Sequence, residues 1–237
     1  MVNREIFNVF PTTIYVSEVE NHLEYKKEFY KLYSKYDYNQ KSFRDNEEWF
    51  NTTSENAGNP LIHLEQSLSG LFEQVIDNVK IYTLEVLKYQ DIFDYVITKT
   101  WLSRARQPND EIRWHIHSTS HISFSYYVNV PPNSHCLEFE NECSKNDLFK
   151  TMNIGDDNPH RSMVENYNEL NSETFYIHPP EGYVAMFPSS LSHNTRFMGG
   201  EFKGERLAIV GDITLMLKED QLHYSMGYID DKYWKKY

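Results

Sequence analysis

The stretch WHIHSTSHISFSYYV, residues 114–128, sets a cluster of histidines directly before an apolar, aromatic strand. His115 and His117 are two residues apart, and in extended backbone such residues point to the same face. Their imidazoles can therefore bind one metal ion. A metal that also handles substrate needs at least a third protein ligand and open coordination positions, so a further donor is expected from a distant strand.

That donor is expected in FPSSLSHNT, residues 187–195, where His193 follows an apolar strand at 183–187. Thirteen residues later, Arg206 opens another apolar stretch, LAIVGDI. An arginine in this place is expected to be partly desolvated, and its guanidinium then needs a carboxylate partner. The residues alone leave the partner open, and it can be the neighbouring Glu205, another internal Asp or Glu, or an anionic ligand.

Short strands separated by turn residues dominate the chain from residue 113 onward. They are expected at 122–130, 136–139, 175–177, 183–187 and 206–217, after an earlier strand at 95–106. A strand at 7–19 and helices at 21–36 and 61–89 come first, because these segments show β-forming residues and helical apolar periodicity respectively. The predicted class is α+β, mainly β, with a double-stranded β-helix (jelly roll) preceded and flanked by N-terminal helices.

A chain of 237 residues fits a single domain. Residues 1–95 would supply the N-terminal strand and helical support, and residues 96–217 the β-helix core. The polar insert at 141–172 is expected to be a lid over the barrel mouth or a mobile loop. The aromatic-rich tail at 218–237 is expected to dock, either on the body of the protein or on a second subunit of a homodimer.

The formal net charge of −12 disfavours nucleic acid as a partner, because phosphate-backbone binding relies on a broad basic surface. No stretch approaches the roughly 18 continuous apolar residues of a membrane span. The N-terminus also lacks an apolar run behind a basic segment. We therefore expect a soluble, cytoplasmic protein without membrane contact. Cys136 and Cys143 lack metal-binding spacing and are expected to be reduced.

Taken in order, these motifs resemble the iron(II)- and 2-oxoglutarate-dependent dioxygenases, and more narrowly a family of oxygenases from phages and marine bacteria. The matching pieces are FPTTIYV at 10–16, HIH at 115–117, SFSYYV at 123–128, FPSSLSH at 187–193 and ERLAIVGDI at 205–213. The resemblance covers nearly the whole chain.

The resemblance implies that His115, His117 and His193 bind Fe(II). It also implies that Arg206 and Tyr127 bind the cosubstrate 2-oxoglutarate. The implied reaction couples oxidative decarboxylation of 2-oxoglutarate by O2 to oxidation, usually hydroxylation, of a primary substrate that the sequence does not identify.

Two positions depart from the superfamily pattern. His117 stands where most members have a carboxylate, and Ala208 replaces a small hydroxyl residue that commonly helps to bind the cosubstrate. These departures keep two alternatives open. One is a non-catalytic jelly-roll module with a binding or structural role. The other is a cupin-type metalloprotein with a four-ligand site made of His115, His117, His121 and His193.

Overall fold

The computed structural model describes residues 11–36, 61–141, 165–168 and 170–218. The start of the predicted opening strand, most of the predicted insert and the predicted tail beyond residue 218 lie outside these ranges. The lid and docking expectations for the insert and the tail therefore stay predictions.

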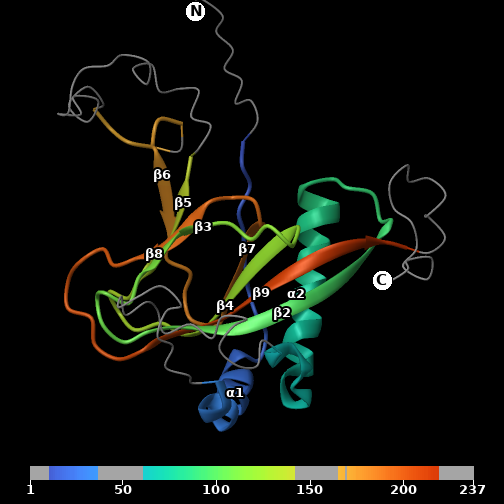
Figure 1. The fold of residues 1–237 in the computed structure, drawn as a ribbon, viewed down its shortest axis with the longest axis horizontal. Helices are drawn as coiled ribbons and strands as arrows, with labels where there is room; N and C mark the ends of the chain where they lie inside the picture. The colour runs from blue at the N-terminus through green and yellow to red at the C-terminus, as the bar shows by residue number, and fades with distance from the viewer. Residues whose placement is uncertain (1–10, 37–60, 142–164, 169, 219–237) are drawn as a thin grey trace, which may run out of the picture.

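Two antiparallel sheets make up the β part of the described chain (Figure 1). The larger sheet has the order β1-β7-β4-β9-β2. Its strands are β1 (Tyr15–Glu18), β7 (Tyr183–Pro188), β4 (Ile122–Asn129), β9 (Arg206–Leu217) and β2 (Phe93–Ala105). The smaller sheet has the order β3-β8-β5-β6. Its strands are β3 (Ile112–His115), β8 (His193–Arg196), β5 (Cys136–Glu140) and β6 (Thr174–Ile177).

From β2 to β9 the chain winds between the two sheets. β2, β4, β7 and β9 belong to the larger sheet, and β3, β5, β6 and β8 belong to the smaller one. Only β5 and β6 are consecutive strands of the same sheet, where they form an antiparallel pair. This winding is that of a jelly roll, so the predicted double-stranded β-helix is confirmed.

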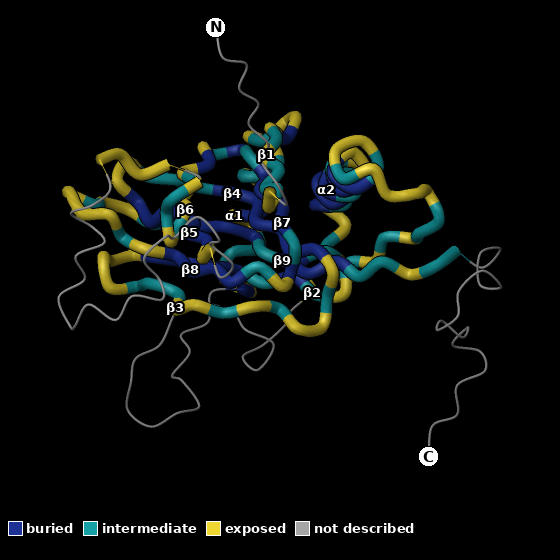
Figure 2. Tube along the Cα trace, turned by 90° about the horizontal axis from the view of Figure 1, so that it is seen from above, coloured by how far each residue is buried: buried dark blue, intermediate teal, exposed yellow. Residues whose placement is uncertain are grey.

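Side-chain alternation along the central strands separates two cores. On β4, Phe124 and Tyr126 join the core that the helices cover, whereas Tyr127 joins the core between the two sheets. Figure 2 shows β4, β7 and β9 as largely buried strands. The inner face of the larger sheet is the more polar one, since it also carries the buried Ser123 and Ser125.

Helices α1 (His22–Tyr36) and α2 (Ser69–Lys80) pack on the outer face of the larger sheet, and α2 buries Leu71, Phe72, Val75 and Val79 there. The prediction of one helix over 61–89 is wrong in its bounds. The segment begins with two 3-10 turns, η1 (Ile62–Leu64) and η2 (Gln66–Leu68), and ends in a π-helical stretch, η3 (Ile81–Val86). None of the described helices has the length and apolar composition needed to cross a membrane.

The early part of that segment is tied to strand β2 instead of continuing a helix. The His63 backbone N–H donates to the Thr100 hydroxyl at 2.9 Å, and Leu61 forms an isolated bridge with the same residue. Glu65 is extended, with φ −71° and ψ 114°, which interrupts helical backbone. The helical spacing of apolar residues in this segment could not reveal these contacts, because they depend on a strand that follows later in the chain.

Candidate metal centre

Two strands of four residues each, whose bounds the sequence did not predict, carry two of the candidate histidines. His115 ends β3 and His193 opens β8, and the two residues are direct partners in the antiparallel pairing. His193 was expected just after a strand, and it begins one. His117 lies two residues beyond β3, where its backbone N–H donates to the Ser189 carbonyl at 2.9 Å.

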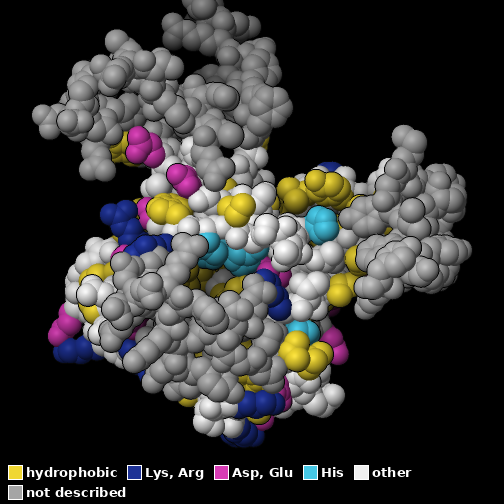
Figure 3. All heavy atoms as spheres, in the orientation of Figure 1, with side chains coloured by type: hydrophobic (Ala, Val, Ile, Leu, Met, Phe, Trp, Pro, Cys, Tyr) yellow, Lys and Arg dark blue, Asp and Glu magenta, His cyan; other side chains and the backbone are white. Residues whose placement is uncertain are grey.

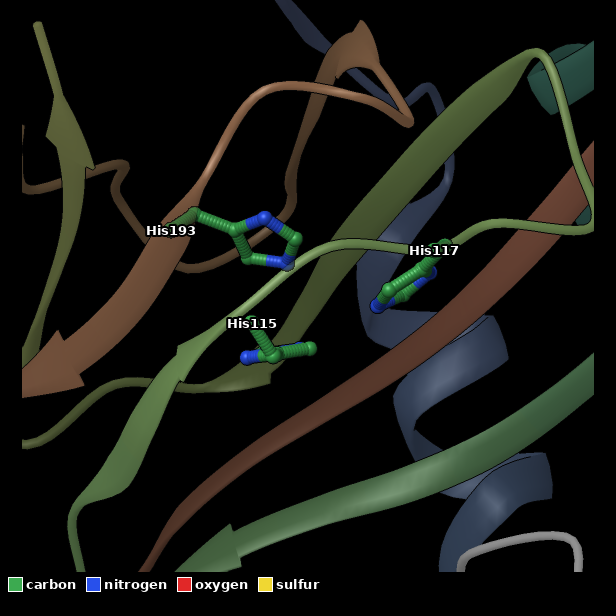
Figure 4. Close-up of side chains that lie close together, drawn as sticks. All are labelled: His115, His117 and His193. Carbon is green, nitrogen blue, oxygen red and sulfur yellow. The ribbon is translucent and has the colours of Figure 1, made fainter. Parts of the chain in front are cut away.

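The three imidazoles point toward one another, as Figure 4 shows. One ring nitrogen of each histidine lies within 4.8 Å of those of the other two. The ring centroids are 4.2 Å apart for His115 and His193, and 5.1 Å apart for His117 and each of the other rings. Among the residues that the structure describes, this is the one group of three metal-ligating side chains.

The second nitrogen of each ring fixes which atom faces the site. Nδ1 of His115 lies 2.8 Å from the Arg113 carbonyl, and Nδ1 of His193 lies 2.8 Å from the Leu191 carbonyl. Since a carbonyl only accepts hydrogen bonds, each of these Nδ1 atoms carries the proton. The lone pair is then on Nε2. Metal-binding histidines are commonly held in this way, with the other ring nitrogen donating to an oxygen.

Burial keeps His115 and His193 uncharged. Desolvation, and after it the neighbouring His115, lower the pKa of His193 to about 3. Desolvation also lowers the pKa of His115. Neutral imidazole is the form that binds metals, so these two histidines are in the metal-binding form at neutral pH.

Asp212 on β9 is the site residue that sequence reasoning missed. It is fully buried, and its Oδ1 lies 2.5 Å from Nδ1 of His117. Ser123 donates to the same oxygen at 3.1 Å, and Lys99 Nζ lies 3.1 Å from Oδ2. Burial by itself favours the neutral acid, but the hydrogen bond from His117 and the charge of Lys99 outweigh it and lower the pKa of Asp212.

Asp212 lies within a motif that the sequence analysis singled out, but its role could not be predicted from that motif. The residue falls within ERLAIVGDI, yet only the strand pairing places it opposite both Lys99 on β2 and Ser123 on β4. Paired residues share a face of the sheet, so the three side chains form one inward-facing row. The sequence alone does not reveal this row of side chains, because it depends on how three distant strands pair.

A cavity of about 340 Å³ opens beside the histidines, between the two sheets. Figure 3 shows histidine side chains reaching the surface near the middle of this face, next to apolar ones. Trp101 lies at 5.5 Å from the His117 ring between centroids. The lining combines apolar side chains with hydroxyls: Trp101, Leu137, Phe187 and Val210, and Ser103, Ser123, Ser125 and Thr195.

Arg206 lines the same cavity and is only 2% exposed. Its Nε has no hydrogen-bond partner, although a buried cation normally has one. The neighbouring Glu205 is not that partner, because its carboxylate binds Arg106 Nε at 2.5 Å and the Tyr33 hydroxyl at 2.6 Å. The alternative that Glu205 is the partner of the Arg206 Nε is therefore not supported.

Tyr127 lies against Arg206, with the guanidinium carbon 5.1 Å from the centre of its ring. Its hydroxyl is buried and has no hydrogen-bond partner. Burial raises the pKa of Tyr127, with the charge of Arg206 acting in the opposite direction. The side chain is thus a hydrogen-bond donor at neutral pH, placed beside the buried cation.

His121 is not brought to the other histidines. Its backbone N–H donates to the Ile213 carbonyl at 3.0 Å, and its Nδ1 accepts from the Leu215 N–H at 3.2 Å. The residue is exposed. The bend before β4 turns this side chain toward the far end of β9, so the four-histidine arrangement has no support in the geometry.

Comparison with known proteins finds a family model that matches part of the chain. Residues 99–212 match the model of a family described as "Putative 2OG-Fe(II) oxygenase". None of the curated proteins matches the sequence.

Two solved structures share the fold at low sequence identity. AviO1 from Streptomyces viridochromogenes Tue57 is 11% identical, with a TM-score of 0.51, and the match covers 86% of this chain and 90% of that one. A prolyl hydroxylase from Trichoplax adhaerens, in complex with a hypoxia inducible factor peptide fragment, is 13% identical, with a TM-score of 0.50 and coverage of 90% and 87%. The family match thus covers residues 99–212, just under half of the chain, and the two solved structures share its jelly-roll fold.

Proposed function

We propose that this chain is an Fe(II)- and 2-oxoglutarate-dependent dioxygenase that oxidises, most simply by hydroxylation, a primary substrate still to be identified. In this proposal His115, His117 and His193 bind the iron, and Arg206 and Tyr127 bind 2-oxoglutarate. The observation that carries the proposal is the common cavity, which has three converging imidazoles at one end and, at the other, a buried guanidinium whose Nε has no hydrogen-bond partner in the protein.

The donor set fits the metal. Three neutral imidazoles leave open coordination positions, which a metal needs if it also binds a cosubstrate and O2. Imidazole is a common ligand of iron, and the proton on Nδ1 already directs each lone pair toward the common centre.

The arginine end fits a dicarboxylate. A guanidinium binds a carboxylate through two parallel hydrogen bonds, and such binding satisfies the buried Nε of Arg206. The Tyr127 hydroxyl is a further donor for the same anion. Within a protein of net charge −12, a buried cation is also what an anionic ligand needs to overcome long-range repulsion.

The register of the larger sheet supplies a substitute for the hydroxyl that Ala208 lacks. Ala208 is paired with Ser103 on one side and with Tyr127 on the other. Ser103 is buried and lines the cavity together with Arg206. We propose that the Ser103 hydroxyl does the work usually assigned to residue 208, and the departure at Ala208 then no longer argues for a non-catalytic module.

Bound iron would supply the oxidative chemistry, in which 2-oxoglutarate is decarboxylated and the substrate is oxidised. The protein's own contribution is binding, orientation and exclusion of water. The histidines hold the metal, Arg206 and Tyr127 orient the cosubstrate along the cavity, and the apolar residues Leu137, Phe187 and Val210 keep its middle dry.

Turnover tests this function. The iron-loaded protein should convert 2-oxoglutarate to succinate slowly without a primary substrate, and the conversion should need both Fe(II) and O2. The H193A variant is the control and should be inactive. Succinate formation at the same rate in H193A would show that the site built here is not responsible. A search for the substrate can then use stimulation of this basal rate as its signal.

A further inference from the structure

The three proposed ligands are all imidazoles, and His117 stands at the position where most members of the wider superfamily have a carboxylate. Among the three rings, His117 is also the one whose Nδ1 lies against an anion. His115 and His193 face backbone carbonyls, whereas His117 faces Asp212 at 2.5 Å. The negative charge that a carboxylate ligand would bring is therefore present on Asp212, which is separated from the proposed metal by the His117 ring.

We propose that Asp212 is a positioning residue that supplies this charge to the metal through His117. The inference rests on the proposed metal site. The carboxylate accepts the Nδ1 proton of His117, fixes the tautomer that offers Nε2, and makes this nitrogen a stronger donor than a ring bonded to a carbonyl. The pair His117–Asp212 then takes the place of the single carboxylate ligand.

The surroundings hold Asp212 in this role. Its side chain is fully buried, and the Ser123 hydroxyl donates to the oxygen that faces His117. Its neighbour Gly211 allows close packing, because a Cβ there would come within 2.6 Å of the Phe124 ring and 2.7 Å of the Thr100 methyl. The backbone of β9 can thus run close to β2 and β4 at this level, which keeps the carboxylate in register with Ser123 and Lys99.

Lys99 offsets part of the negative charge that Asp212 supplies to His117. Its Nζ lies 3.1 Å from the other carboxylate oxygen, and its side chain keeps 19% of its surface exposed. A partly solvated cation at the outer oxygen offsets part of the charge while leaving the His117 side of the carboxylate free to act on the ring. Removal of the cation should thus strengthen metal binding, and removal of the carboxylate should weaken it.

The test is the affinity of metal-free protein for Co(II), measured by the visible absorption of the bound ion and by competition with a chelator. D212N keeps the shape and an acceptor oxygen but loses the charge, and it should bind Co(II) about 10- to 100-fold more weakly. E138Q is the matched control, since Glu138 is a buried carboxylate that pairs with Arg196 in the smaller sheet. It should bind Co(II) as the parent does.

Introducing D212N into the H117D variant separates an effect of charge from general damage to the fold. In H117D the ligand itself carries the charge and has no Nδ1–H to orient, so adding D212N should change Co(II) affinity less than about three-fold. An equal loss in both backgrounds would make Asp212 a structural residue and overturn the inference. If D212N does not fold, the K99M variant provides the test instead. The inference requires K99M to bind Co(II) more tightly than the parent protein, and weaker binding overturns it.

The two proposals fail in different ways. If the parent protein binds no Co(II), the metal site itself is wrong. If the parent binds Co(II) and D212N binds equally well, the metal site stands and the role of Asp212 is wrong.

Discussion

At the histidine end of the cavity each ring Nδ1 faces an oxygen of the protein, whereas at the arginine end Arg206 Nε and the Tyr127 hydroxyl are buried without a hydrogen-bond partner. Unsatisfied buried polar groups are costly, so their presence at one end calls for an explanation. The proposed function accounts for this difference: the protein itself orients the three histidines, and 2-oxoglutarate would complete the arginine end.

The largest effect should come from the metal end. H193A removes one of three donors, and the described residues bring no further histidine to the site, so stoichiometric iron binding should be lost. The fold should survive, because His193 sits at the start of a short strand of the smaller sheet. Anaerobic metal analysis checks this. H121A is the matched control and should keep a full equivalent of iron, since His121 bonds to the backbone of Leu215 and not to the cluster.

The next effect concerns the arginine end. R206K keeps the charge but loses the planar fork that binds a carboxylate through two bonds. We expect 2-oxoglutarate affinity to fall about 30- to 1000-fold, which corresponds to roughly 2 to 4 kcal/mol. Calorimetric titration of the Mn(II)-loaded protein measures the loss, and Mn(II) affinity should stay the same. Equal 2-oxoglutarate affinities in parent and variant would remove Arg206 from the binding site.

A third prediction uses the buried histidines in the metal-free protein. The pKa of His193 is lowered from 6.5 to about 3 in the folded state. Between these values the unfolded chain binds a proton that the folded chain does not, so stability is lost as the pH falls below about 6.5. One such proton gives a slope of about 1.4 kcal/mol per pH unit.

Urea unfolding of the metal-free protein between pH 7 and pH 4 measures that slope. H193Q should reduce the slope by up to the contribution of one proton. His115 should account for part of the remaining slope, because its pKa is also lowered in the folded state. Identical slopes in parent and H193Q would mean that His193 is not held neutral by burial.

The smallest effect tests the substitute for the hydroxyl at residue 208. S103A removes one hydrogen bond to the cosubstrate, so 2-oxoglutarate affinity should fall about five-fold, or roughly 1 kcal/mol. A208S, which restores a hydroxyl between Ser103 and Tyr127, should recover most of that loss when added to S103A. An unchanged affinity in S103A would leave Tyr127 and Arg206 as the only protein donors of the proposal.

Strong local patterns in the sequence predicted much of this molecule. The apolar strands β2, β4, β7 and β9 were found because their sequences leave few other structures open. HIH and FPSSLSH gave the three histidines, and the place of Arg206 before an apolar stretch indicated its burial. These features depend on residues that are close together in the chain.

What the sequence did not reveal depends on pairing between distant segments. Strands β3 and β8 are only four residues each, which is too short for alternation or composition to mark their bounds. The roles of Asp212 and Ser103 follow from the register of β9 with β2 and β4. His121 lies in the same short stretch as His117, and only the bend before β4 separates their directions.

One measurement tests the central claim most directly, that the two ends of the cavity together bind iron and 2-oxoglutarate. Under anaerobic conditions, 2-oxoglutarate is titrated into the Fe(II)-loaded protein while the visible absorption is followed. The account predicts a metal-to-ligand charge-transfer band that saturates at one equivalent and is lost in H193A. A parent protein that retains a full equivalent of Fe(II) and shows no such band at saturating 2-oxoglutarate would contradict it.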